Sequence, residues 1–195
     1  MQPACVPLRL FQGATFRDVL RLSQPTRVYR DIQSIQAVAP VRLVVPDHGV
    51  PSEWPVWVVG VQQWPEINRQ PVTGRPWQAL RVDENTLEIN TLSAVGQRPA
   101  GGQLIYLAPV DLISCTARMQ IRDRPGGQLL LELGSGPGQG LVIEQAGTIR
   151  REISAVQTGA LPAAAAVYDL EVTFADGSVL RWVEGPVTVS PQVTL

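Results

Sequence analysis

The side chains that could do chemistry in this sequence are few and scattered. His48 is the single histidine, so a Ser-His-Asp triad or a zinc site has one histidine candidate at most. It stands in Asp47-His48-Gly49, a run of residues that favours turns. We therefore expect His48 to have a structural role and predict no catalytic residue.

Two other segments have compositions that occur at active sites. Residues 83–88 contain carboxylates that could act as the acid and base of glycoside hydrolysis, but residues 83–85 are more typical of a β-turn. The glycine-rich residues 134–140 could surround a phosphate. That run lacks a terminal Lys-Ser/Thr, and the apolar segment after it predicts a strand rather than a helix. Both segments are predicted to be loops.

Composition excludes further classes of chemistry. Lys and Arg together number 16 and all are arginine, so there is no lysine for a Schiff base or a phosphate loop. We attribute this bias to a GC-rich genome. Cys5 and Cys115 are too few for a disulfide framework or a zinc site, and Cys115 is expected to be a small core residue. We expect no metal and no cofactor.

The charge and the apolar pattern give no indication of nucleic-acid or membrane binding. The formal net charge is −1, which offers no electrostatic attraction to a phosphate backbone or a lipid surface. No apolar run is long enough to span a bilayer, and no signal peptide is visible. We therefore expect the chain to fold in a cytoplasm, with both cysteines reduced.

Alternation of apolar and polar residues predicts an all-β fold. In residues 115–122, Ala117, Met119 and Ile121 share one face with Cys115, and polar residues share the other. Residues 168–184 are predicted to form a hairpin, with Tyr168, Leu170 and Val172 in the core. Residues 186–193 are predicted to add a last edge strand, because the segment contains two prolines. Residues 154–161 are predicted to form a short helix that Pro162 ends.

The middle of the chain differs in composition. Four of the five tryptophans lie between residues 32 and 107, where short strands are predicted at 32–39, 41–45, 56–61, 78–82 and 86–89. This change predicts three parts: residues 1–31, which begin a sandwich, residues 32–107, which form an inserted barrel, and residues 108–195, which complete the sandwich.

The outer parts resemble a known phage domain. Residues 109–123, Pro-Val-Asp-Leu-Ile-Ser-Cys-Thr-Ala-Arg-Met-Gln-Ile-Arg-Asp, are similar to a segment of the immunoglobulin-like domain at the N-terminus of phage baseplate upper proteins. Residues 12–16, 147–149, 167–172, 176–177, 184–185 and 187–191 match its other landmarks. The pattern departs at Ile113-Ser114-Cys115, where Thr-Gly-Tyr is usual.

The inserted part resembles a second phage-tail module. Residues 35–43, 47–49, 56–61, 66–68, 82–90 and 101–102 are similar to a small barrel related to the first catalytic cysteine half-domain of ubiquitin-activating enzymes. The insertion contains no cysteine. Together the two resemblances imply an immunoglobulin-like β-sandwich with an inserted small β-barrel and no enzymatic activity.

These resemblances imply a structural protein of a tailed-phage virion, assembled in the bacterial cytoplasm. We expect the protein to lie in the tail, in the baseplate or at a fibre-attachment position. Its expected partners are other virion proteins, and the chain itself is expected to form a ring or a trimer. A head or collar decoration protein and a carbohydrate-binding host-attachment module are the alternatives. Arginine and aromatic side chains are enriched at interfaces. The candidate interface residues are therefore Arg17, Arg21, Arg27, Arg30, Trp54, Trp57, Trp64 and Trp77, with core packing and sugar stacking as other roles for the tryptophans.

Overall fold

A computed structural model describes residues 2–144 and 146–193, and the fold is all-β, as predicted. The described residues contain sixteen strands, the short helix α1 (Ala155–Ala160) and the one-turn helix η1 (Pro65–Ile67). The chain divides into two compact units. Unit 1 comprises Met1–Leu22 and Asp111–Leu195, and unit 2 comprises Ser23–Val110.

Unit 2 begins earlier in the chain than residue 32, where the sequence analysis placed the boundary. Strand β4 (Ser23–Asp31) pairs antiparallel with β10 (Gln103–Pro109), from Asp31 opposite Gln103 to Ser23 opposite Pro109. The nine residues of β4 therefore belong with the inserted unit and not with the sandwich. Composition could not show this, because the tryptophan-rich region begins after β4.

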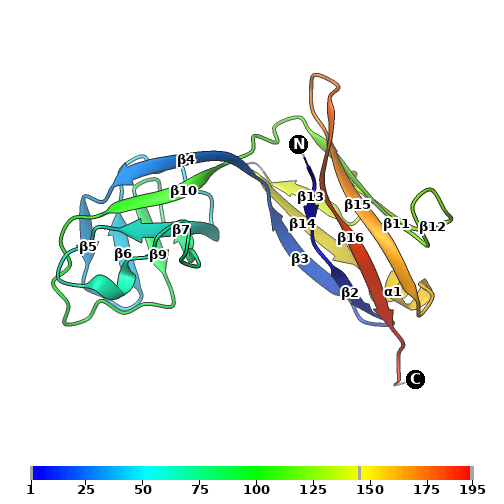
Figure 1. The fold of residues 1–195 in the computed structure, drawn as a ribbon, viewed down its shortest axis with the longest axis horizontal. Helices are drawn as coiled ribbons and strands as arrows, with labels where there is room; N and C mark the ends of the chain where they lie inside the picture. The colour runs from blue at the N-terminus through cyan, green and yellow to red at the C-terminus, as the bar shows by residue number, and fades with distance from the viewer. Residues whose placement is uncertain (1, 145, 194–195) are drawn as a thin grey trace. The chain divides into compact units, whose positions relative to one another are not determined.

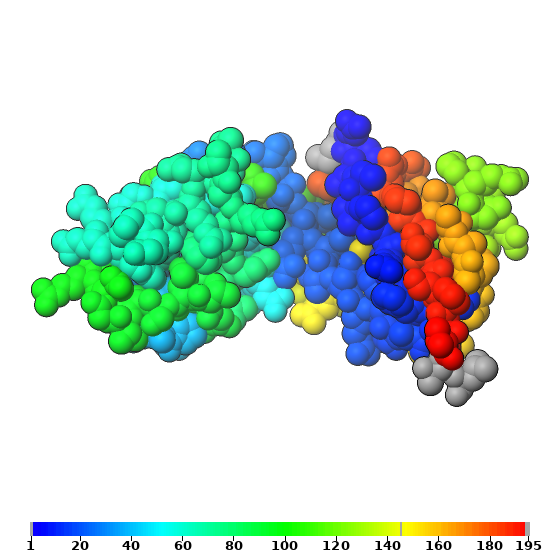
Figure 2. Space-filling model, turned by 60° about the horizontal axis from the view of Figure 1, so that its bottom comes forward, coloured from blue at the N-terminus to red at the C-terminus, as the bar shows by residue number. Residues whose placement is uncertain are grey.

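Unit 1 is a two-sheet sandwich. The larger sheet has the order β1-β16-β15-β11-β12, with β2 also pairing with β16, and the smaller sheet has the order β13-β14-β3. Figure 2 shows the N-terminal and C-terminal strands lying along one another on one side of this unit. The strands are β1 (Ala4–Cys5), β2 (Leu8–Phe11), β3 (Phe16–Arg21), β11 (Thr116–Arg122), β12 (Leu129–Gly134), β13 (Leu141–Glu144), β14 (Thr148–Ile153), β15 (Ala165–Thr173) and β16 (Val179–Ser190).

The core of the sandwich contains the residues that alternation predicted. Met119, Ile121, Tyr168, Leu170 and Val172 are all buried. Cross-strand register places Met119 opposite Leu170 and Ile121 opposite Tyr168, so each inward residue packs beside another inward residue.

The prediction for Cys115 was wrong. The side chain is partly exposed, because β11 begins one residue later, at Thr116. Cys115 instead closes a turn in which its N–H donates to Leu112 C=O at 3.2 Å, and Ser114 has a φ of 58°. This is the site where the sequence departs from the phage-domain pattern, and the turn there ends the alternation.

The last strand was also misplaced. β16 is one strand of twelve residues that lies between β15 and the N-terminal strands, not a separate edge strand. Glu184 C=O accepts from Val6 N–H at 2.8 Å, so the backbone of Pro186 faces the same side as that carbonyl. Pro186 is tolerated there because the parallel ladder is interrupted between β1 and β2, where no N–H is required.

The predicted short helix is confirmed. Ser154 is its N-cap and forms a capping box with Gln157, and the helix ends at Ala160, before Pro162. The glycine-rich loop is followed by strand β13, as expected.

Unit 2 is a seven-stranded curled sheet with the order β4-β10-β7-β8-β9-β6-β5 (Figure 1). The strands at the two ends of this order, β4 and β5, are joined by two residues. Ile32 N–H donates to Gly102 C=O and Gln33 N–H donates to Val44 C=O, which draws both ends of the sheet together. The remaining strands are β5 (Ser34–Gln36), β6 (Val41–Val44), β7 (Trp54–Val59), β8 (Trp77–Arg81) and β9 (Thr86–Ile89).

Candidate interaction site

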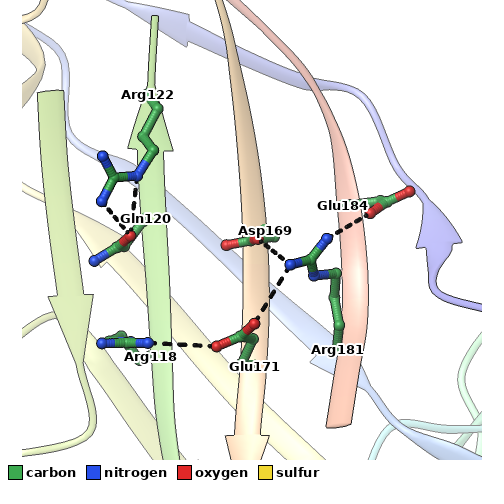
Figure 3. Close-up of polar contacts among 7 residues, drawn as sticks. All are labelled: Arg118, Gln120, Arg122, Asp169, Glu171, Arg181 and Glu184. Atoms are coloured by element: carbon green, nitrogen blue, oxygen red, sulfur yellow. Dashed lines mark hydrogen bonds and ion pairs between the residues drawn. The ribbon is translucent and has the colours of Figure 1, made fainter. Parts of the chain in front are cut away.

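The outward face of the larger sheet of unit 1 carries a network of charged side chains from three adjacent strands. β11 supplies Arg118, β15 supplies Asp169 and Glu171, and β16 supplies Arg181 and Glu184 (Figure 3). The side chains of β11 and β15 alternate with the buried ones of the same strands, so the pleat directs them outward. On β16 the register shifts by one residue between Arg181 and Val183, and this irregularity brings Arg181 and Glu184 to the same face. We call this surface the charged face; it also includes Gln120 and Arg122.

Arg181 is the centre of the charged face. Its Nη2 lies 3.1 Å from Asp169 Oδ2 and 3.5 Å from Glu171 Oε1, and its Nη1 lies 3.5 Å from Glu184 Oε2. The nearby Asp169 raises the pKa of Arg181 above its usual value. Arg118 Nη2 contacts Glu171 Oε2 at 3.4 Å, which continues the network to β11. Exposed ion pairs of this kind add little stability.

A depression of about 390 Å³ lies within the charged face, and its lining includes Asp169, Arg181 and Glu184. Arg122 stands on one side, held by bonds to Gln120 Oε1 and by a 2.6 Å bond from its Nη1 to Gly127 C=O. The residues that line the depression include Cys5 and Asp169 but no histidine, so no thiol–imidazole pair is present there.

The glycine-rich loop borders a wider groove of about 1090 Å³. The basic side chains around it are already paired: Arg17 with Glu152 at 2.9 Å and Arg150 with Glu144 at 2.6 Å. The arginines that line the groove thus bind carboxylates of the chain itself, which gives no support to phosphate binding at the loop.

His48 holds a turn in unit 2. The residue is fully buried, its Nδ1 accepts from Val50 N–H at 2.9 Å, and its Nε2 lies 3.0 Å from Asp83 C=O. The proton therefore resides on Nε2, which donates to Asp83. Burial, followed by the charge of Arg81, lowers the pKa of His48 and keeps the ring neutral.

Residues 83–85 form the turn that their composition predicted. Asn85 N–H donates to Asp83 Oδ1 at 2.7 Å, and this bond lowers the pKa of Asp83. Glu88 is paired with Arg42 at 2.9 Å on the neighbouring strand. The two carboxylates are thus engaged in separate local contacts.

Three of the four candidate tryptophans are core residues of unit 2. Trp54, Trp64 and Trp77 are buried in one apolar cluster, and the indole N–H groups of Trp54 and Trp77 donate to Leu107 C=O and Ile67 C=O. A partner or a sugar cannot reach them on the folded unit. Trp57 faces away from this cluster and is partly exposed, with its N–H donated to Gly74 C=O at 2.8 Å.

The four candidate arginines do not form one group. Arg17 and Arg21 lie on β3 of unit 1, whereas Arg27 and Arg30 lie on β4 of unit 2. Arg17 is engaged with Glu152, and Arg30 faces the Tyr106 hydroxyl. Arg27 is exposed on β4 and lies on the same side of that strand as Tyr29.

A buried ion pair in unit 1 escaped the sequence analysis. Arg151 is only 2% exposed and binds Asp18 with two nitrogens, the Nε–Oδ1 distance being 2.7 Å. Its guanidinium also lies 5.5 Å from the ring centre of Tyr168. The signal was present, because Arg151 lies at the inward parity set by Ile149 and Ile153 on β14.

The described residues include neither a candidate metal site nor a helix able to cross a membrane. Within residues 2–144 and 146–193, no cluster of three or more His, Cys, Asp or Glu side chains is placed to hold a metal ion. Their helices also include none with the length and apolarity that a membrane crossing requires. Comparison with known proteins adds no relative: no family model and no curated protein matches the sequence.

Proposed function

We propose that this chain is a non-enzymatic structural protein of a tailed-phage virion, in the tail, the baseplate or a fibre-attachment position. It assembles with other virion proteins through protein–protein interfaces. Its resemblance to two phage modules motivates the proposal, and the placement of the resembling segments supports it.

The observation that carries the proposal is that the resembling segments of unit 1 are neighbours in one sheet. Residues 116–122, 167–172 and 187–190 lie on β11, β15 and β16, which are adjacent in the larger sheet. These segments also supply most of the charged face. The segments that resemble the phage domain thus supply both the buried core residues and most of the outward charged residues of this sheet.

The charged face suits assembly. Its charged side chains come from three adjacent strands and contact one another, so cations and anions lie side by side on one surface. Opposite charges arranged on a surface select the orientation of a partner more than they add affinity. A protein that must occupy one defined position in a particle needs that selectivity.

Immunogold labelling of intact phage particles tests the proposal. An antibody raised against the purified chain should label one fixed position on each particle, and label on the tail or its tip supports the proposed station. Label on the head or the collar would favour the decoration-protein alternative. Unlabelled particles from an infection that expresses the protein would contradict the virion assignment.

A further inference from the structure

β4 is an edge strand with an open side. It lies at one end of the seven-stranded sheet, where β10 is its neighbour (Figure 1). Seven of its nine residues are exposed, so no other described element covers the strand. An uncovered edge presents N–H and C=O groups that a strand of another chain can bond.

The ladder determines which backbone groups are open. Ile32 N–H donates to Gly102 C=O at 3.0 Å, and the register continues without a shift from Asp31 to Arg27. Residues of an antiparallel strand direct both backbone groups alternately toward the partner and away from it. The even-numbered residues of β4 therefore bond β10, and the N–H and C=O groups of Arg27, Tyr29 and Asp31 face the open edge.

The side chains of the same three residues lie on one face of the strand. The central residue, Tyr29, is flanked by a cation on one side and an anion on the other. Tyr29 is 51% exposed. Arg27 is exposed and forms no ion pair with any described carboxylate. Asp31 accepts a bond from Gln103 Nε2 at 3.0 Å and is otherwise exposed. In the sequence Arg-x-Tyr-x-Asp, the cation thus lies two residues before the tyrosine and the anion two residues after it.

We propose that β4 pairs antiparallel with β4 of a second copy of this chain, about a two-fold axis at Tyr29. In this register Arg27 lies opposite Asp31 of the partner subunit, and Tyr29 lies opposite Tyr29 of the partner subunit. Each of these pairs uses backbone groups that face the open edge, so the ladder and the ion pairs form together. A two-fold interface of this kind is self-complementary and closed.

Other registers of the same two strands are less favourable. An axis at Arg27 places the two arginines opposite each other, and like charges in that position are destabilising. An axis at Val28 places Arg27 opposite Tyr29 of the partner subunit, and an axis at Arg30 places Asp31 opposite that tyrosine, so in neither register does Arg27 lie opposite Asp31. The Tyr29 register is therefore the one in which the hydrogen bonds and the charges agree. This inference does not depend on the proposed virion function.

Sedimentation equilibrium of the full chain over a range reaching high micromolar concentration tests the pairing. The wild-type chain should show a monomer–dimer equilibrium. Arg27→Glu and Asp31→Arg should each weaken dimerisation about tenfold or more, since each reversal places like charges opposite one another at both ends of the interface. The double variant, Arg27→Glu with Asp31→Arg, should recover dimerisation because the opposite charges are exchanged.

Matched controls separate the edge from general effects. Arg98→Glu and Glu84→Arg make the same charge changes on exposed loops of unit 2 and should leave dimerisation unchanged. Tyr29→Pro removes an N–H that β10 does not use, so the variant should keep its circular dichroism spectrum but dimerise less than Tyr29→Ala. A wild-type chain that is monomeric throughout the range would overturn the proposal. So would a double variant as weak as the single ones, which would indicate a partner strand other than β4.

Discussion

Arg151 and Asp18 form a two-pronged ion pair between β14 and β3, and the guanidinium lies inside the sandwich. The Arg151 side chain is 1% exposed, whereas that of Asp18 is 33% exposed. Arg151 also contacts Met119 Sδ at 3.7 Å, so the cation is surrounded by core residues on its other side. The pair therefore links neighbouring strands of the smaller sheet, and its buried cation packs against Met119 and Tyr168 of the larger sheet.

Asp18→Asn should destabilise unit 1 by about 2–3 kcal/mol, because the buried cation loses its counter-ion. Chemical denaturation followed by circular dichroism measures the loss. Glu152→Gln is the matched control, since it breaks the neighbouring exposed pair with Arg17, and it should cost far less. Equal losses in the two variants would show that Arg151 is not held by Asp18.

Acidification should destabilise unit 2 through His48. Burial lowers the pKa of His48 in the folded chain, so between that pKa and the unfolded value of about 6.5 the unfolded chain binds more protons. Stability should therefore be constant above about pH 7 and fall as the pH drops through about 6. Fluorescence of the buried tryptophans during urea unfolding reports this unit.

His48→Gln is the control for that titration. The amide has no proton to gain in this range, so the slope between about pH 7 and 5.5 should disappear even if the variant is less stable overall. An unchanged slope in His48→Gln would assign the pH dependence to another group. The carboxylates whose pKa values are lowered, such as that of Asp83, contribute only at lower pH.

Leu170→Ala should destabilise unit 1 by about 2–5 kcal/mol, because Leu170 is fully buried opposite Met119 and the substitution leaves a cavity. Thr116→Ala, at an exposed position of β11, is the comparison and should change stability by less than about 0.5 kcal/mol. Denaturation midpoints give both values. A loss for Leu170→Ala as small as that for Thr116→Ala would contradict the assigned core.

Excision of unit 2 should leave a folded sandwich. Ser23 and Pro109 are paired across β4 and β10, so the ends of unit 1 at Leu22 and Asp111 are close enough for a short Gly/Ser linker. A cut at residues 32–107, the boundary expected from composition, removes most of β10 and leaves β4 without its partner. Deletion of the whole of unit 2, Ser23–Val110, should instead leave a chain with a β-type circular dichroism spectrum and a cooperative unfolding transition. An unfolded product would contradict the division into two units.

Local patterns predicted much of this fold. Alternation in residues 116–122 and 167–173 identified the strands and the core, and turn composition identified the roles of His48 and Asp83. Alternation failed where long-range pairing decides the outcome. Pro186 was taken as an edge residue because the break between β1 and β2, which accommodates it, lies at the other end of the chain.

For the candidate interface residues too, local sequence patterns were not enough, and long-range structure decided which residues are exposed. The sequence identified eight arginines and tryptophans by type, and burial removes Trp54, Trp64 and Trp77 from any surface. The register of β4 with β10 places the backbone groups of Arg27 at the open edge of the sheet, and no local sequence pattern predicts that register. Arg151 was missed because its partner Asp18 lies on β3, far away in the sequence, and only the pairing of β14 with β3 brings the two together.

Quantitative mass spectrometry of gradient-purified particles tests the central claim most directly. If the chain is a virion structural protein, it should be present at a fixed copy number per particle that a high-salt wash does not reduce. The account also predicts that alanine substitution of Arg27 or Trp57 leaves the chain folded but lowers this copy number. Absence of the wild-type chain from purified particles would contradict the account.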